Sequence, residues 1–253
     1  MMATVAVTSL LPAYNAKADE SANNGAICTP TTEPLGDQTS SSGNDEGIAT
    51  FVGGDMYVGG KKTGILYRAR DYHGTTIGTL SACGQFERKV QYGPFAPGFY
   101  EFPDCDVYRS KFGDCADLGV KMAKQLEEVI LTVGPDELGA VIVEPMTAGG
   151  GILVPPAGYY ETIREICDKY ELLLIMDEVV CGMGRTGKMF GYQHYGIVPD
   201  IVTMAKGVAS AYMPISATVT SEKIFQAFLH DPADKLAYFR DISTFGGCAT
   251  AST

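Results

Sequence analysis

The sequence predicts an α/β fold with a mostly parallel sheet and helices on both of its faces. Three short runs, at residues 140–143, 172–176 and 201–205, are apolar almost throughout and have the length of strands. Segments with helical spacing of apolar residues precede the first two runs. Strands that alternate with helices, and that are not interrupted by polar residues, are typical of a parallel sheet buried on both sides. We expect right-handed crossovers between them.

The elements follow in chain order after a polar beginning. Residues 1–45 are rich in Gly, Ser, Thr and Asn, have no helical or strand period, and are predicted to be irregular or disordered. Residues 46–253 are predicted to form one domain. The segment "FVGGDMYVGGKKTG" at its start predicts a glycine-rich hairpin, and regular structure is expected from "GILYRARDYHGTT" onward.

Two helices are predicted between the strands. From Asp114 to Gly134 apolar residues recur every three or four positions, with Asp114 as the expected N-cap and Gly134-Pro135 as the stop. The stretch "AGYYETIREICDKY", residues 157–170, places its aromatic and aliphatic side chains on one helical face. The strand "LLLIM" follows this second helix at once.

Composition excludes several classes of partner. The chain has 253 residues, with 30 acidic against 19 basic residues and a net charge of −11. Nucleic acids and anionic membranes need a basic face, so neither is expected as a partner. The seven cysteines form no C-x-x-C pair, and the N-terminal apolar stretch has no basic residue before Lys17. We therefore expect reduced thiols, no metal site and a cytoplasmic protein rather than an exported one.

Each of the three apolar runs ends at a polar residue with catalytic potential. The first is followed by Glu144, the second by Asp177 and the third by Lys206. Ligands of open parallel sheets bind beyond the carboxyl ends of the strands, so these side chains are expected to converge on one crevice. Gly207 beside the lysine is expected to leave room for a ligand.

The chemistry of this trio favours one cofactor. A lysine in such a crevice can attack a carbonyl to form a Schiff base. Pyridoxal phosphate needs that lysine and also an acid beside its ring nitrogen. Aldolase-type chemistry would use Lys206 without the acid and stays open at this point. A strand-end carboxylate can also simply mark the return to solvent, which is the simpler interpretation of Glu144 or Glu178 taken alone.

Five motifs carry a family resemblance. "YHGTT", "VEPMTAGGG", "DEVVCGMGRTG", "PDIVTMAKG" and "STFGG" occur in an order that resembles the class III (omega) aminotransferases, pyridoxal-phosphate enzymes of fold type I. The resemblance covers about residues 39–247 and is greatest for the amine–pyruvate and taurine–pyruvate branches. It implies that residues 46–253 are the large cofactor-binding domain, incomplete, with the C-terminal small domain absent.

The resemblance also implies roles for individual residues. Lys206 matches the lysine that binds the cofactor aldehyde and moves a proton, and Asp177 matches the acid at the pyridine nitrogen; these two are the expected catalytic residues. Tyr72 and Val179 match the residues on the two faces of the cofactor ring. His73 matches the motif histidine, for which a structural role remains equally open.

Further cofactor-binding positions are implied around the ring and the phosphate. Glu144 matches the glutamate of an E-P motif close to the cofactor. Ser42 and Gly43 match the phosphate loop, in which Asn44 stands where the family has serine. Thr244 matches a threonine that reaches the phosphate of the neighbouring subunit's cofactor, which implies a homodimer with shared active sites.

The function expected from this resemblance is transamination. The enzyme would move an amino group from an omega-amine or taurine-like donor to pyruvate or a similar 2-oxo acid. Two alternatives remain open: a truncated aminotransferase domain that binds the cofactor without turnover, and another pyridoxal-phosphate reaction such as that of an aminomutase. The sequence leaves the physiological donor and acceptor undetermined.

Overall fold

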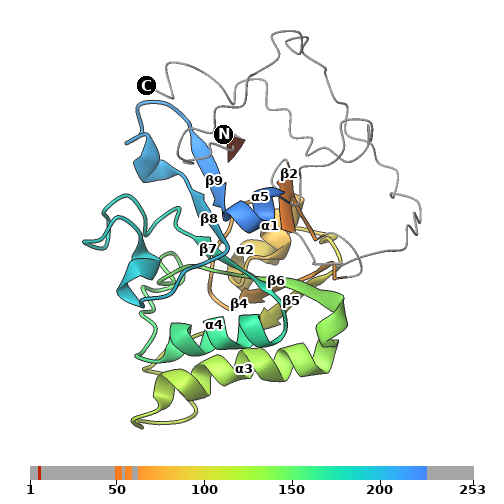
Figure 1. The fold of residues 1–253 in the computed structure, drawn as a ribbon, viewed down its shortest axis with the longest axis vertical. Helices are drawn as coiled ribbons and strands as arrows, with labels where there is room; N and C mark the ends of the chain where they lie inside the picture. The colour runs from red at the N-terminus through yellow and green to blue at the C-terminus, as the bar shows by residue number, and fades with distance from the viewer. Residues whose placement is uncertain (1–4, 7–48, 53–54, 59–61, 227–253) are drawn as a thin grey trace.

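A seven-stranded sheet forms the centre of the computed structural model, which describes residues 5–6, 49–52, 55–58 and 62–226 (Figure 1). The strand order is β1-β9-β8-β7-β6-β4-β5. The bounds are β1 Val5–Ala6, β4 Gly64–Arg68, β5 Phe99–Phe102, β6 Leu138–Val143, β7 Leu173–Asp177, β8 Ile201–Met204 and β9 Ser216–Thr220. Every neighbouring pair is parallel except β8 with β9. The predicted α/β class with a mostly parallel sheet is confirmed.

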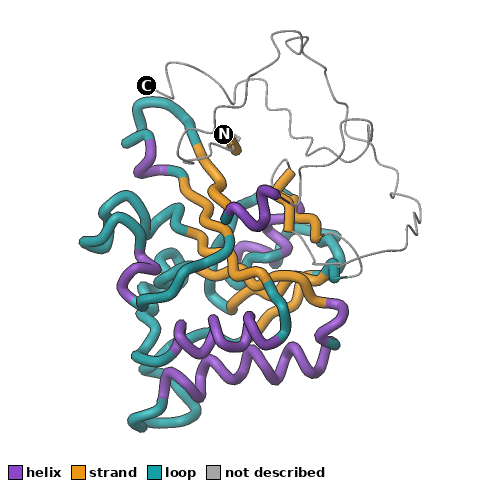
Figure 2. Tube along the Cα trace, viewed as in Figure 1, coloured by secondary structure: helices purple, strands orange, loops and turns teal. Residues whose placement is uncertain are grey.

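Helices cover both faces of the sheet, as the apolar runs predict. The helices are α1 Ile77–Ser81, α2 Phe86–Lys89, α3 Leu118–Val133, α4 Tyr159–Lys169 and α5 Glu222–Gln226, with short 3₁₀ turns at Pro135–Glu137 (η2), Gly191–His194 (η3) and Lys206–Val208 (η4). The long helices α3 and α4 run side by side on one face, and α1 and α5 lie on the other (Figures 1 and 2). Successive strand residues point to opposite faces. Leu66 therefore packs with the α3–α4 cluster, while Ile65 packs with Ile224 of α5.

The helix α3 ends where the sequence predicts but begins later. Its C-cap is Gly134 with φ of 112°, a conformation that suits glycine. Its N-cap is Asp117, so the prediction of Asp114 was wrong. A tight turn, in which the Leu118 amide donates to the carbonyl of Cys115, separates Asp114 from the first helical turn. Asp117 also pairs with Lys121 one turn on, at 2.9 Å.

The glycine-rich segment near the start of the domain forms the predicted hairpin. Strands β2 Ala49–Val52 and β3 Asp55–Val58 pair antiparallel, with Val52 opposite Asp55. Of the segment 1–45, only residues 5–6 are described; they form β1, parallel to β9. The expectation of irregular structure for the rest of 1–45 lies outside the described residues.

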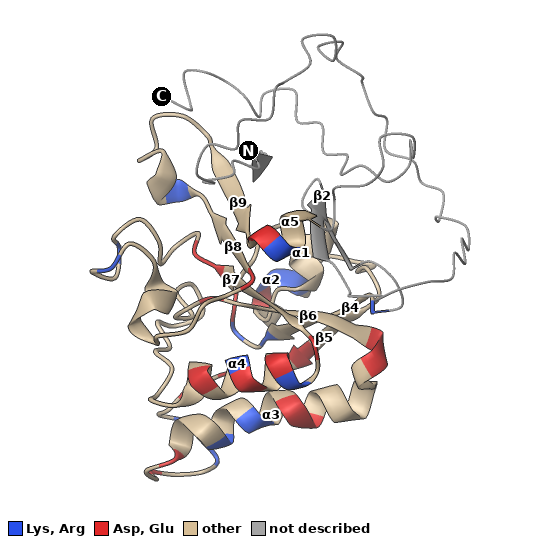
Figure 3. Cartoon of the chain, viewed as in Figure 1, with Lys and Arg blue, Asp and Glu red and all other residues tan. Residues whose placement is uncertain are grey.

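Within the central strands β4, β6, β7 and β8, charged residues occur only at the carboxyl ends. Acidic and basic residues are frequent along α3 and α4, whereas β6, β8 and β9 carry none (Figure 3). Strands β4 and β7 carry one each, at their last residues Arg68 and Asp177. Because β4, β6, β7 and β8 are parallel, their carboxyl ends lie along one edge. None of the helices described in the structure has the length and apolar character needed to cross a membrane.

Candidate active site

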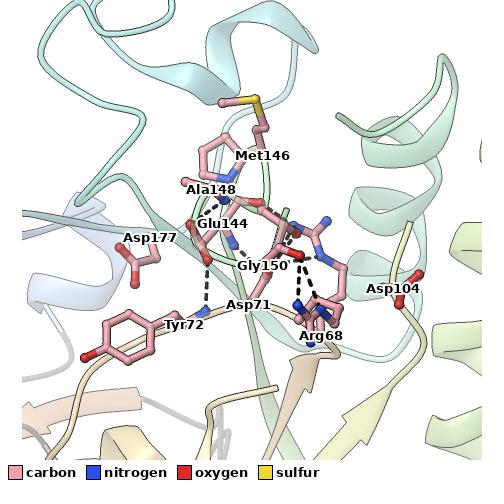
Figure 4. Close-up of polar contacts among 12 residues, drawn as sticks. Arg68, Asp71, Tyr72, Asp104, Glu144, Met146, Ala148, Gly150 and Asp177 are labelled. Atoms are coloured by element: carbon pink, nitrogen blue, oxygen red, sulfur yellow. Dashed lines mark hydrogen bonds and ion pairs between the residues drawn. The ribbon is translucent and has the colours of Figure 1, made fainter. Parts of the chain in front are cut away.

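Strand register brings Glu144 and Asp177 to the same edge of the sheet. Val143 pairs with Met176, so the residues that follow them, Glu144 and Asp177, lie next to each other. Asp177 pairs in turn with Thr203 of β8, three residues before Lys206. Figure 4 shows Asp177, Glu144 and Tyr72 grouped beyond the strand ends. The predicted convergence of the first two strand ends is therefore observed.

Asp177 forms a buried pair with His73. The Nδ1 atom of His73 lies 2.8 Å from Oδ2 of Asp177, and the two side chains are 1% and 7% exposed. Burial alone would lower the pKa of His73, but the hydrogen bond and the charge of Asp177 outweigh it, and the pKa is raised above its ordinary value. The other carboxylate oxygen of Asp177 accepts a hydrogen bond from the Val179 amide at 3.0 Å. The neighbouring carboxyl group of Asp177 thus favours the protonated form of His73.

The second ring nitrogen of His73 has no hydrogen-bond partner in the part of the chain that the structure describes. Nε2 is buried, and it makes no hydrogen bond among the described residues. Buried polar atoms are usually satisfied, and an exception indicates a role for a ligand or for a group that completes the site. A histidine with only a structural role would be expected to bond through both nitrogens. This favours a functional interpretation of His73.

Glu144 is held by the backbone of two loops. Its Oε1 accepts a hydrogen bond from the amide of Tyr72 at 2.9 Å, and its Oε2 accepts one from Ala148 at 3.1 Å. The residue is 2% exposed, and burial raises the pKa of Glu144 to about 7, with the neighbouring Asp71 as the next cause. Glu144 therefore does not mark a return to solvent. It connects the strand end to the loop that carries Tyr72 and His73.

A fully buried ion pair fixes the backbone of Glu144. Nη2 of Arg68 donates to the Glu144 carbonyl at 2.7 Å, and Oδ2 of Asp71 accepts from the Glu144 amide at 2.9 Å (Figure 4). The side chains of Arg68 and Asp71 are 0% exposed, and Nη2 of Arg68 lies 3.0 Å from Oδ1 of Asp71. Thr147 bonds to both, and the Tyr160 hydroxyl donates to the Glu144 carbonyl. We call Arg68 and Asp71 the strand-end clamp.

The strand-end clamp was missed by sequence reasoning. The available signal was an arginine at the end of an apolar strand with an aspartate three residues later. An arginine is almost never fully buried unless it is paired, so the burial could not be predicted from composition. Only the fold shows that the two side chains turn inward together.

Glu178, which follows the last residue of β7, has a structural role. Glu178 is 1% exposed and lies on the other side of the strand from Asp177. Its two oxygens accept hydrogen bonds from the amides of Gly191 and Tyr192, both at 2.8 Å. These amides open the 3₁₀ turn η3, whose first donors have no partner within the turn. Burial raises the pKa of Glu178.

Lys206 begins the turn η4 in a strained backbone conformation. Its φ is 47°, in the left-handed region that residues with a Cβ rarely adopt. Such outliers are concentrated at functional sites. The side chain is exposed, and its amine makes no hydrogen bond within the described part of the chain. A Cβ at Gly207 would lie 2.9 Å from the Cβ of Met183, so packing also requires glycine there, and the room that it was expected to leave for a ligand stays a prediction.

Tyr72 is half-buried, and one side of its ring is covered by a cation. The guanidinium carbon of Arg88 lies 4.7 Å from the centroid of the Tyr72 ring. Val179 is also half-buried and is joined through its amide to Asp177. Both residues therefore stand beside the Asp177–His73 pair, while their predicted contacts with a cofactor ring remain predictions. The predicted phosphate-site residues Ser42, Gly43, Asn44 and Thr244 lie outside the described residues.

A cavity of about 340 Å³ lies next to the strand-end clamp. It is lined by Arg70, Asp104, Asp106, Arg109, Gly150, Gly151 and Leu153. None of the predicted site residues lines it, and its arginines are engaged with Glu87 and Asp106. Among residues 62–226 and the short strands described before them, no three Asp, Glu, His or Cys side chains are arranged to hold a metal ion.

Comparison with known proteins agrees with the geometry. The family model "Aminotransferase class-III" matches residues 50–251. The taurine–pyruvate aminotransferase of Bilophila wadsworthia is 88% identical over 197 residues, which are 78% of this chain and 43% of that protein. The hypotaurine/taurine–pyruvate aminotransferase of Paracoccus denitrificans is 58% identical over 192 residues, 76% of this chain and 42% of that protein.

Solved structures give the same result. An aminotransferase of Bacillus anthracis superposes with a TM-score of 0.69 at 41% identity, over 76% of this chain and 43% of that one. The present chain thus spans less than half the length of the curated relatives that it matches.

Proposed function

The chain belongs to the class III aminotransferase family, whose cofactor is pyridoxal 5′-phosphate, and from this we propose that it transfers an amino group from an omega-amine or taurine-like donor to pyruvate or a similar 2-oxo acid. One observation carries the proposal. The buried pair of Asp177 with His73 stands beside Glu144 at the edge of the sheet where Lys206 follows the neighbouring strand. The high identity to relatives named taurine–pyruvate aminotransferase supports the donor and acceptor classes.

The residues of the site fit the cofactor. Asp177 is a carboxylate almost excluded from water, with one oxygen paired to His73 and the other to the Val179 amide. A buried carboxylate in this setting suits a protonated pyridine nitrogen. Lys206 offers an exposed amine on the adjacent strand end. Tyr72 and Val179 would cover the ring, and Ser42, Gly43, Asn44 and Thr244 would hold the phosphate.

The bound cofactor supplies an electrophilic carbonyl and a ring that withdraws electrons from the carbon bearing the donor's amino group. Lys206 would act on that carbon: its amine, once free, would take the proton from the donor and return it to the former aldehyde carbon of the cofactor. The strained φ of Lys206 holds the amine at the end of β8 instead of letting the strand continue.

The other residues of the site fix charge and position. His73 orients the Asp177 side chain, because its Nδ1 lies 2.8 Å from Oδ2 of the carboxyl group. Glu144 joins the amides of Tyr72 and Ala148, and so sets the loop on which Tyr72 and His73 stand. The strand-end clamp keeps Glu144 in place from behind.

A homodimer is part of the proposal. Large apolar side chains are exposed on the single chain, among them Tyr108 and Tyr212 at 90% and Phe86 at 74%. Where such side chains form one contiguous patch, a partner usually covers it. A second copy would also bring Thr244 to the neighbouring site. The mass of the purified protein by light scattering tests this, and a monomer at micromolar concentration contradicts it.

We also place the enzyme in the cytoplasm. The five described cysteines, Cys83, Cys105, Cys115, Cys167 and Cys181, are free thiols, and four of them are buried. Free thiols are typical of reducing compartments. Fractionation of cells that produce the protein at native levels tests this placement, and recovery outside the cytoplasm refutes it.

The central test is spectral and chemical. Purified protein given pyridoxal phosphate is expected to develop visible absorbance, and borohydride is expected to fix the cofactor to the peptide that contains Lys206. Lys206→Ala should abolish the adduct, while Lys124→Ala, on the exposed side of α3, should keep it. Taurine or β-alanine should then convert the bound cofactor to its amine form. A bound cofactor that no amine converts would mean a cofactor-binding domain without turnover.

A further inference from the structure

Arg88 stands at the site with part of its guanidinium unused. It lies on the short helix α2, its side chain is exposed, and its guanidinium carbon is 4.7 Å from the ring centroid of Tyr72. Tyr72 is joined through its amide to Glu144 and precedes His73 in the chain. Arg88 is therefore close to the loop that carries His73, the partner of Asp177.

Arg88 is anchored at one end only. Its Nε donates to Oε1 of Gln85 at 2.5 Å. Gln85 is itself 1% exposed, and its Nε2 donates to the carbonyl of Arg70 at 3.0 Å. Within the described residues, Nη1 and Nη2 of Arg88 have no hydrogen-bond acceptor, which leaves four N–H groups free. The buried side-chain amide of Gln85 thus orients the guanidinium of Arg88 and leaves Nη1 and Nη2 open to a ligand.

The other two arginines near the site differ from Arg88, because their donors are occupied. The buried carboxylates there have partners of their own: Asp71 pairs with Arg68, and Asp177 pairs with His73. Arg68 is enclosed and spends its donors on Asp71, Glu144, Thr147 and Tyr160.

Arg70 is also engaged. It donates to both oxygens of Glu87 and to the Gly150 carbonyl. Of these three arginines, Arg88 is therefore the one whose outer N–H groups have no acceptor among the described residues.

We propose that Arg88 binds the acidic group of the amino donor, a sulfonate or a carboxylate. The inference rests on the proposed transaminase function and deepens it, because it assigns the donor class to compounds that carry an anion near the amine. The open fork of a guanidinium matches two oxygens of either group. The cation–π contact with the Tyr72 ring helps to hold the guanidinium of Arg88 in place.

A competing role for Arg88 is to position the Tyr72 ring. A positioning role would affect every donor equally, and would also alter the spectrum of the bound cofactor. Recognition of an anion would affect only donors that carry one. The two roles therefore differ in a measurable way.

The direct test is binding of ethanesulfonate, which lacks an amine and cannot react. Isothermal titration of the cofactor-loaded full chain should detect binding, and Arg88→Ala should weaken it at least about tenfold, the scale of one charge-assisted hydrogen bond. Arg88→Lys should restore part of the affinity. Arg109→Ala is the matched control, because Arg109 is also exposed and stacks on a tyrosine, Tyr108, at 5.5 Å. Propionate in place of ethanesulfonate separates carboxylate from sulfonate recognition.

Donor kinetics form the second arm. Arg88→Ala should lower kcat/KM at least about tenfold for taurine and β-alanine, and leave it unchanged for propylamine, which has no anion. An equal loss for all three donors, or ethanesulfonate binding that is absent or insensitive to Arg88→Ala, overturns the inference. A wild-type chain that transfers from no donor refutes the proposed function, while the titration still decides the role of Arg88.

Discussion

The ring nitrogen Nδ1 of His73 and the carboxylate oxygen Oδ2 of Asp177 meet at 2.8 Å although the residues lie 104 positions apart in the chain. His73 stands on the loop after β4, and Asp177 ends β7, with β6 between the two strands. The loop after β4 must therefore reach across the end of β6. Glu144, which follows β6, accepts the Tyr72 amide on the way and makes that crossing possible.

The His73–Asp177 pair should make stability depend on pH. The folded state raises the pKa of His73, so its contribution is complete below the unfolded value of about 6.5 and is lost as the pH rises through the folded value. His73→Phe should therefore cost more stability at pH 6 than at pH 9. Urea titrations of wild type and variant at both pH values measure this. His194→Phe, at an exposed position, controls for the loss of a histidine; an equal cost at both pH values would contradict the pairing.

Asp177 and Glu178 provide a matched pair of carboxylates with opposite expected results. Asp177→Asn should retain some cofactor but abolish transfer, because the charge at the ring nitrogen is lost. Glu178→Gln should leave transfer intact and lower the free energy of unfolding by about 1–3 kcal/mol, because one amide of η3 loses its acceptor. Single-turnover absorbance and urea unfolding measure the two effects. Loss of transfer in Glu178→Gln, with Asp177→Asn active, would reverse the assignment.

The sequence predicts the sheet well because its signals there are strong. The apolar runs at β6, β7 and β8 cannot be exposed, and their length suits strands. Glu144 and Asp177 follow directly from the carboxyl ends of those strands. By contrast β9, with the sequence SATVT, pairs antiparallel with β8 and has no apolar run that would predict it.

Other features depend on long-range contacts that a local pattern does not contain. Asp114 and Asp117 are both good N-cap residues, and only the turn at Cys115 selects the second. The clamp of Arg68 and Asp71 requires that β6 lie beside β4, which brings the Glu144 backbone within reach. Arg88 similarly meets Tyr72 only because the chain turns back at Gln85.

The strand-end clamp should be essential to stability as a pair. Arg68→Met would leave Asp71 buried without its cation, and we expect a loss of about 3–5 kcal/mol in the free energy of unfolding. Arg68→Met combined with Asp71→Asn should recover part of that loss, because no uncompensated charge remains. Urea unfolding of the three proteins measures this. Arg109→Ala, at the surface, should change stability by less than about 0.5 kcal/mol; a double variant that is no more stable than Arg68→Met would contradict the pairing.

Glu144 should give a pH dependence in the same direction as that of His73, because the cost of burying its carboxyl group grows as the proton is lost. Burial raises the pKa of Glu144 to about 7 from 4.5, so the folded state holds the proton more tightly than the unfolded chain. Stability should then fall as the pH rises from about 4.5 to about 7, by up to roughly 3 kcal/mol. Glu144→Gln removes this titration, so the stability of wild type relative to the variant should be greater at pH 5 than at pH 8.

The same comparison has a structural control. Glu87 is exposed and paired with Arg70, unlike the buried Glu144. Glu87→Gln should therefore leave the pH dependence of wild-type stability in place over this interval. Urea unfolding at pH 5, 6, 7 and 8 gives the four points needed. If wild type and Glu144→Gln differ by a constant amount across the series, Glu144 keeps the same charge in the folded and unfolded states. Its burial would then have to be offset by the amides of Tyr72 and Ala148 alone.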